Sequence, residues 1–211
     1  IKKADCVIME TTYGNRVHGK NSTGISQLIE IVLKTIKRGG TVVIPSFAVG
    51  RTQELIFEFN RFYEKSSPDY KKELDGVEVI VDSPMATNAT EVFRKNAQVF
   101  DEETKEYIMR GDNPLDFKNL RFTRSTEESQ ALNMDKRPKV IISASGMCEA
   151  GRIRHHLKHN LWDARNSIVF VGYQAQGTLG RSILEGKKDV TLFGEEVHIN
   201  AQIYNLEGFS G

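Results

Sequence analysis

Apolar residues along this chain follow either a helical period or short continuous runs. Between positions 25 and 36 they recur at helical spacing, which predicts an amphipathic helix that ends at Gly39-Gly40. A continuous run at 41–44, ended by Pro45, is typical of a buried strand. The same criteria predict further strands at 77–81, 140–142 and 168–171, and further helices over 51–63, after Asp82-Ser83-Pro84, from Ile153 to Leu161, and over 179–184.

The two ends and the middle of the chain carry weaker patterns. Cys6 to Met9 is a short apolar run that we interpret as a first strand ending at Glu10. Residues 100–135 are more polar and suggest helices with loops, and 190–206 alternate as strands with one exposed face do. Repeated strand–helix units with continuous apolar strands predict an α/β fold, a mainly parallel sheet with helices on both faces.

Composition narrows the class of protein. The chain has 211 residues, of which 39% are hydrophobic, so it can bury a sizeable core. Its 29 Lys and Arg almost balance its 28 Asp and Glu, which excludes a disordered acidic or basic tail. Any affinity for nucleic acid must therefore come from local patches that the fold assembles.

The cysteines and the termini indicate the setting. Cys6 and Cys148 form no CxxC pair and cannot build a disulfide framework, which favours a reducing, intracellular compartment such as the cytoplasm. The apolar runs are far shorter than the roughly 20 residues of a membrane span. The chain starts at Ile1 and stops at Ser210-Gly211, so we expect it to be a piece of a longer protein.

Distinctive loops follow the predicted strands, at the sheet edge where parallel α/β folds bind ligands. They are the segments 10–14, 45–52, 82–85, 143–147 and 172–178. Glycine-rich turns and helix N-termini attract anions, and Arg51, Arg152 and Arg181 lie beside three of these loops, so together they predict a surface that grips phosphate oxygens. The alternative is that strand-to-helix turns need Gly, Ser and Pro for their geometry alone.

Two other signals have limited weight. Segment 172–178 matches a P-loop only in part, because Thr178 stands where the phosphate-binding lysine belongs, which argues against ATP binding. A doubly wound nucleotide-binding domain is therefore the weakest hypothesis. The second signal is a basic cluster made of Arg152, Arg154, His155, His156, Lys158 and His159. His155 and His159 have ligand-capable spacing, but Arg154 and Lys158 would repel a cation, so a basic, solvated helix face near RNA or another domain is favoured.

The helix that follows 140–142 ends in a tryptophan. Trp162 comes directly after Leu157 and Leu161 at helical spacing, and we therefore assign it to the core.

Five segments carry a family resemblance. They are IMETTYGNRVH (8–18), PSFAVGRTQE (45–54), DSPMA (82–86), SASGMCEAGRIRHHL (143–157) and GYQAQGTLGR (172–181). In order and spacing, over nearly the whole chain, the sequence resembles the β-CASP region of metallo-β-lactamase-type nucleases. That group includes RNase J enzymes and the endonuclease subunit of the pre-mRNA cleavage and polyadenylation factor. The resemblance implies a Rossmann-like β-CASP fold flanked by strands of a truncated metallo-β-lactamase domain.

The resemblance also implies domain limits and a catalytic residue. Residues 1–14 and 188–211 would belong to the metallo-β-lactamase domain, and 15–187 would form the β-CASP domain. Glu10 occupies the acidic motif position, where its carboxylate would orient a histidine that in the family follows a Ser-Gly or Ser-Ala pair. For Tyr13 two roles stay open, stacking on a base or bracing the cleft.

Roles in binding substrate phosphate are carried over, as implications of the resemblance, to the motif residues Ser46, Arg51, Thr52, Ser145, Gly146, Arg152, Thr178 and Arg181. The parent enzyme would hold two zinc ions and hydrolyse phosphodiester bonds, but the zinc-binding HxHxDH segment has no counterpart in this chain, so we assign no metal ligand here.

The expected partners are single-stranded RNA, the remaining metallo-β-lactamase domain and a second copy in a homodimer, with no membrane. The fragment alone is expected to be inactive. The alternative is a non-catalytic RNA- or protein-interaction module.

Overall fold

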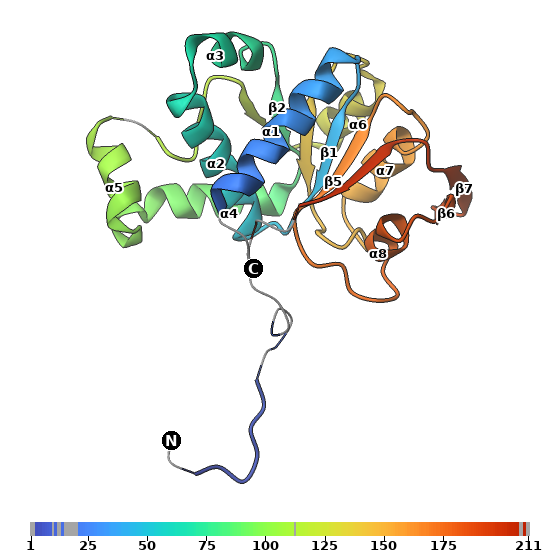
Figure 1. Ribbon diagram of the computed structural model, residues 1–211, viewed down its shortest axis with the longest axis horizontal. Coiled ribbons are helices and arrows are strands. Elements are labelled where there is room, and N and C mark those ends of the chain that lie inside the picture. The colour runs from blue at the N-terminus through green and yellow to red at the C-terminus, as the bar shows by residue number, and fades with distance from the viewer. Residues whose placement is uncertain are drawn as a thin grey trace.

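The fold is built on one six-stranded sheet. The computed structural model describes residues 3–9, 11, 14, 21–111, 113–206 and 209. The strand order is β3-β2-β4-β1-β5-β8 and every pair is parallel, as the sequence predicts (Figure 1). The strands are β1 Val42–Pro45, β2 Val79–Val81, β3 Leu120–Phe122, β4 Val140–Ser143, β5 Ser167–Phe170 and β8 Gln202–Asn205. A separate antiparallel hairpin joins β6 (Asp189–Leu192) to β7 (Glu195–His198).

Helices connect the parallel strands. They are α1 Asn21–Lys37, α2 Arg51–Lys65, α3 Pro68–Leu74, α4 Pro84–Lys95, α5 Glu102–Met109, α6 Thr126–Met134, α7 Ile153–Asn160 and α8 Leu179–Leu184, with the 3₁₀ turn η1 at Ala97–Val99. The predicted helices are confirmed, whereas α3 and the edge strand β3 were not foreseen. Within the described part of the chain, no helix combines the length and the apolar character that crossing a bilayer requires.

Both faces of the sheet are covered, because successive strand residues point to opposite sides. Val42 and Ile44 of β1 belong to the core that also includes the apolar faces of α1 and α2. Val43, between them, packs into a second core with residues of α7 and α8. Figure 1 shows α1 in front of the sheet and α7 behind it. The prediction of helices on both faces is thus confirmed.

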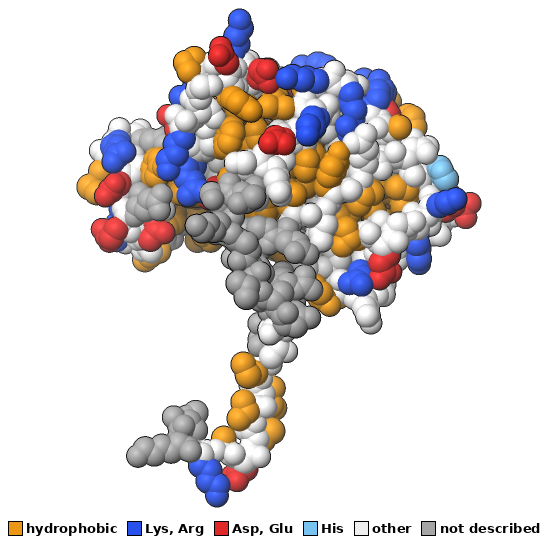
Figure 2. Space-filling view, viewed as in Figure 1, with side chains coloured by type: hydrophobic (Ala, Val, Ile, Leu, Met, Phe, Trp, Pro, Cys, Tyr) orange, Lys and Arg blue, Asp and Glu red, His pale blue; other side chains and the backbone are white. Residues whose placement is uncertain are grey.

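Two expectations about single segments are wrong. Cys6–Met9 is not a strand: no described strand pairs with it, and backbone groups in a strand need a neighbour to bond. Instead Val7, Ile8 and Met9 are exposed on a segment that extends away from the sheet, where Figure 2 shows a row of hydrophobic side chains. Trp162 is 50% exposed and not in the core, because α7 ends at Asn160 and the helical spacing no longer holds beyond it.

Candidate nucleic-acid interface

The strand order brings four of the five predicted loops to one edge. β2, β4, β1 and β5 are consecutive neighbours, so the loops that follow their carboxyl ends are adjacent, at the lower edge in Figure 1. Backbone contacts tie them together, since Ser46 N donates to Ser143 O at 2.9 Å and Asp82 N donates to Ile142 O at 2.9 Å. Most of the fifth loop, with Glu10 and Tyr13, lies outside the described residues.

The loop after β1 uses its polar side chains internally. Ser46 and Thr52 are almost completely buried, and Thr52 Oγ1 donates to Phe47 O at 2.7 Å and to Ser46 Oγ at 3.1 Å. Arg51 is 8% exposed and forms an ion pair with Glu54. Its guanidinium carbon Cζ lies 6.0 Å from the centre of the Phe209 ring. These side chains hold the turn from β1 into α2 in one conformation.

The loops after β4 and β5 are tied together by one amide. Gln174 Nε2 donates to Gly146 O at 2.9 Å, to Gly172 O at 3.1 Å and to Tyr173 O at 3.2 Å, and the side chain is 3% exposed. Gly180 makes room for it, because a Cβ at that position would lie 1.8 Å from Gln174 Oε1. The amide therefore fixes both loops, a role that no motif in the sequence signalled.

Gly146 is also a point of close approach to the loop after β1. A Cβ at Gly146 would lie 2.9 Å from Cδ2 of Phe47 and 3.2 Å from the backbone nitrogen of Phe47. Both distances are shorter than the contacts that Cβ atoms ordinarily make. The aromatic ring of Phe47 therefore packs directly on the backbone of Gly146. Next to it, Ser145 Oγ is half-buried and accepts a hydrogen bond from Ala150 N at 3.3 Å.

Thr178 and Arg181 stand at the start of α8. Thr178 caps this helix, because its Oγ1 accepts a hydrogen bond from Arg181 N at 3.2 Å. Arg181 keeps 33% of its side chain exposed while its Nε donates to Glu185 Oε1 at 2.6 Å. Among the residues assigned to phosphate, Ser145, Arg152, Thr178 and Arg181 are partly exposed, and the side chain of Arg181 is more exposed than that of Arg152.

Asp82, at the end of β2, is the centre of a buried network. Its Oδ2 accepts hydrogen bonds from Ser129 Oγ at 2.6 Å and from His156 Nε2 at 2.5 Å. Its Oδ1 accepts from Thr123 Oγ1 and from Arg152 Nη1, the latter at 2.7 Å. Asp82 and His156 are both completely buried. The network joins the ends of β2 and β3 to helices α6 and α7.

The network keeps Asp82 ionised. Burial by itself would raise the pKa of this carboxyl, but the hydrogen bonds that it accepts, with that from His156 the largest, hold the pKa far below its usual range. Arg152, whose side chain is only 18% exposed, therefore forms an ion pair with an ionised, buried carboxylate. Its Nη2 also donates a hydrogen bond to Arg124 O at 3.3 Å.

The basic segment 152–159 divides between two environments. His155 and His159 are exposed, whereas His156 lies on the apolar face with Ile153 and Leu157, so the expectation of a solvated face is wrong for His156. His155 stacks on Phe193 of the β6–β7 turn at 4.4 Å. Across the described residues, no group of three or more His, Cys, Asp or Glu side chains could hold a metal ion. Zinc therefore has no fitting site among them.

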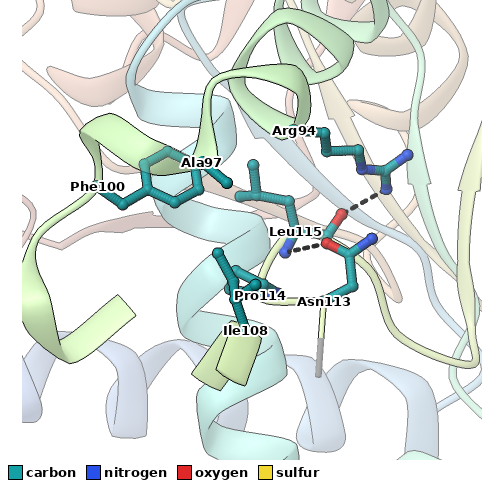
Figure 3. Close-up of a pocket in the computed structure, with 7 residues that line it drawn as sticks. All are labelled: Arg94, Ala97, Phe100, Ile108, Asn113, Pro114 and Leu115. Carbon is teal, nitrogen blue, oxygen red and sulfur yellow. Dashed lines mark hydrogen bonds between the residues drawn. The ribbon is translucent and has the colours of Figure 1, made fainter. Parts of the chain in front are cut away.

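Away from this edge, a cavity lies between α4, α5 and residues 113–115. It measures about 190 Å³ and is lined by Arg94, Ala97, Phe100, Ile108, Asn113, Pro114 and Leu115. Figure 3 shows the guanidinium of Arg94 bonded to Leu115 O, at 2.6 Å, beside the apolar side chains. The described residues of the lining include no carboxylate, histidine or cysteine, so these residues offer no group for acid–base or nucleophilic chemistry.

An α/β domain with glycine-rich loops gathered at the carboxyl edge of a parallel sheet belongs to the class that binds ligands there. Comparison with protein families narrows this class. Residues 52–183 match the Beta-Casp domain, and the chain belongs to this family, as the motifs indicate.

Curated relatives agree with the assignment. The chain is 39% identical to "Ribonuclease TTHA0252" of Thermus thermophilus over 99% of its own length and 46% of that protein. It is 34% identical to "Transcription termination factor FttA" of Methanocaldococcus jannaschii, covering 99% of this chain and 33% of the relative. An "RNase J-like protein" of the same organism is 32% identical over 98% of this chain and 46% of the relative. The chain thus spans between a third and a half of the length of these relatives.

Proposed function

We propose that this chain is the RNA-gripping β-CASP portion of a metal-dependent ribonuclease that hydrolyses phosphodiester bonds. The observation that supports it most is the gathering of the family motifs at one sheet edge, in a chain whose relatives include proteins named ribonuclease. Residues 15–187 are the proposed β-CASP domain, with the flanks belonging to a metallo-β-lactamase domain. The proposed setting is the cytoplasm, with single-stranded RNA as substrate and a homodimer as the working form.

The proposed roles of the edge residues follow their exposure. Ser145, Thr178 and Arg181 contact phosphate oxygens, whereas Gly146, buried beneath the Phe47 ring, shapes the loop that presents Ser145. Ser46, Arg51, Thr52 and Arg152, which are largely buried, contribute by holding the loops in place. Because Arg guanidinium groups pair strongly with phosphate, Arg181 supplies the largest single contribution.

Residues outside the described part complete the proposal. Glu10 orients a histidine of the parent's metal centre, and Tyr13 stacks on a base or braces the cleft. Two zinc ions, bound by ligands elsewhere in the parent, would activate a water molecule for attack on the phosphodiester. In this chain the proposed task is to bind and orient the strand.

The substitution Arg181→Ala in the parent protein tests the proposed contact between Arg181 and an RNA phosphate. Removing one phosphate contact should lower the slope of log affinity against log salt by about 0.7 for single-stranded RNA, measured by fluorescence anisotropy. The matched control is Arg110→Ala, because Arg110 pairs with Glu106 four residues away as Arg181 does with Glu185, but lies at the end of α5. An unchanged slope for Arg181→Ala would contradict the assignment.

Cleavage assays separate the enzyme from an interaction module. The parent should cut RNA with zinc and lose activity when the metal is chelated, whereas the 211-residue chain should bind RNA weakly and cut nothing. A parent that binds RNA without cutting it would support the non-catalytic alternative. Full zinc-dependent hydrolysis by the isolated chain would exclude our assignment of the metal ligands to the missing part.

A further inference from the structure

Among the described residues, two aromatic side chains are exposed at the edge where RNA is proposed to bind. Phe47, in the loop after β1, is 46% exposed, and Tyr173, in the loop after β5, is 37% exposed. β1 and β5 are neighbours in the sheet, and neighbouring strands lie about 4.8 Å apart, so the two loops leave the sheet side by side. Neither residue was assigned a role from the motifs.

The structure holds both residues on a firm support. The ring of Phe47 packs on Gly146, where no side chain could be accommodated without moving it. The backbone carbonyl of Tyr173 is bonded by the Gln174 amide, and the same amide bonds the carbonyl of Gly146. The supports of the two aromatic residues are thereby joined through one buried side chain. A surface preorganised in this way loses little conformational entropy when a planar ligand binds to it.

The chemistry of the edge suits a nucleic-acid base. Aromatic side chains beside cationic ones are the arrangement that single-strand binders use, with bases stacked on rings and phosphates near the charges. Here Thr178 and Arg181 follow Tyr173 within one loop and the first turn of a helix. Met85, in the loop after β2, is a further exposed apolar side chain at this edge.

We infer that Phe47 and Tyr173 form a stacking surface for the bases of single-stranded RNA, next to the phosphate contacts of Arg181. The inference rests on the proposed function and deepens it, because it divides recognition between rings that read the presence of a base and a guanidinium that reads the backbone. Since every base has a flat face, such a surface binds without sequence preference.

The test compares two oligoribonucleotides of equal length, an oligouridylate and a strand with the same phosphates but abasic sugars. Their affinities for the parent protein are measured by fluorescence anisotropy with the metal chelated, so that no strand is cut. The wild type should prefer the oligouridylate by about 5- to 150-fold for each stacked base. In Phe47→Leu/Tyr173→Leu this preference should collapse toward one, with affinity for the abasic strand unchanged.

Three further variants sharpen the result. Tyr173→Phe keeps the ring and should keep the preference. Tyr70→Leu removes another exposed aromatic side chain, 45% exposed on α3 far from this edge, and should have no effect on it. Val49→Ala removes apolar surface at the edge without removing a ring, and should also leave the preference intact.

The outcomes distinguish the two proposals. A wild type that binds RNA, with a double variant that retains its base preference, overturns the stacking surface and leaves the proposed function standing. Loss of thermal stability in both the double variant and Val49→Ala, with no change in base preference, would show that another part of the parent covers these residues, which also overturns the inference. A wild type with no affinity for either strand refutes both proposals.

Discussion

Replacing Asp82 by alanine should destabilise this chain strongly, because it removes the acceptor at the centre of a buried network. The carboxylate accepts four hydrogen bonds, two of them from Arg152 and His156. Without it the guanidinium of Arg152, 18% exposed, loses its buried counter-charge. Breaking a buried ion pair by removing one partner typically costs about 3–5 kcal/mol, and we expect a loss of unfolding free energy in that range.

Urea unfolding at neutral pH, followed by circular dichroism, measures this loss. The control is Glu106→Ala, which removes one partner of an exposed ion pair with Arg110 and should cost about 0.3–0.5 kcal/mol. A double-mutant cycle with His156→Ala gives the coupling between Asp82 and His156, expected at about 0.5–3 kcal/mol. A cost below about 1 kcal/mol for Asp82→Ala would refute the argument that the network stabilises the sheet edge.

The pH dependence follows from the depressed pKa of Asp82. A carboxyl with a lower pKa in the folded than in the unfolded state adds stability above its unfolded pKa, about 3.9, and that stability is lost as the pH falls toward the folded value. The difference in unfolding free energy between wild type and Asp82→Asn should therefore be complete near pH 7 and should shrink below about pH 4. A difference that stays constant or grows in acid would contradict the assigned direction.

Two further predictions concern other positions. Gly146→Ala should cost about 1–3 kcal/mol in a urea titration, because the new Cβ would lie 2.9 Å from the Phe47 ring, and the smaller Phe47→Leu background should relieve part of that cost. Burial raises the pKa of the Cys148 thiol, so in native protein iodoacetamide should label the exposed Cys6 and leave Cys148 unlabelled until urea is added, as mass spectrometry would show. Rapid native labelling of Cys148 would mean that α7 opens locally.

The buried strands and amphipathic helices could be predicted because their pattern is local. The edge strand β3 escaped notice, since Leu120, Arg121 and Phe122 are only half-buried and form no continuous apolar run. A signal for His156 was available, because it recurs at helical spacing with Ile153 and Leu157. The basic neighbours of His156 led instead to the prediction of a solvated face.

The Asp82 network could not be read from the sequence. Asp82 stands in a motif, but Thr123, Ser129 and His156 are far from it along the chain, and no sequence pattern links any of them to Asp82. Only the strand order, which places β2 between β3 and β4, brings them together. The gathering of the loops was predictable because it follows from parallel strands alone, whereas the partners of Arg51 and Arg152 depend on three-dimensional packing.

The central position of β1 bears on how this domain is made. Val42 pairs with Val140 on one side and with Ser167 on the other, so the first strand of the sheet has both of its neighbours in the last third of the chain. During synthesis β1 leaves the ribosome long before either neighbour exists. The backbone groups at its two edges have no partner strand until translation has passed Ser143 on one side and Phe170 on the other. Such late, non-local pairing slows folding. Until both pairings have formed, the open edges of β1 can pair with another chain instead, which makes the unfinished domain prone to aggregate.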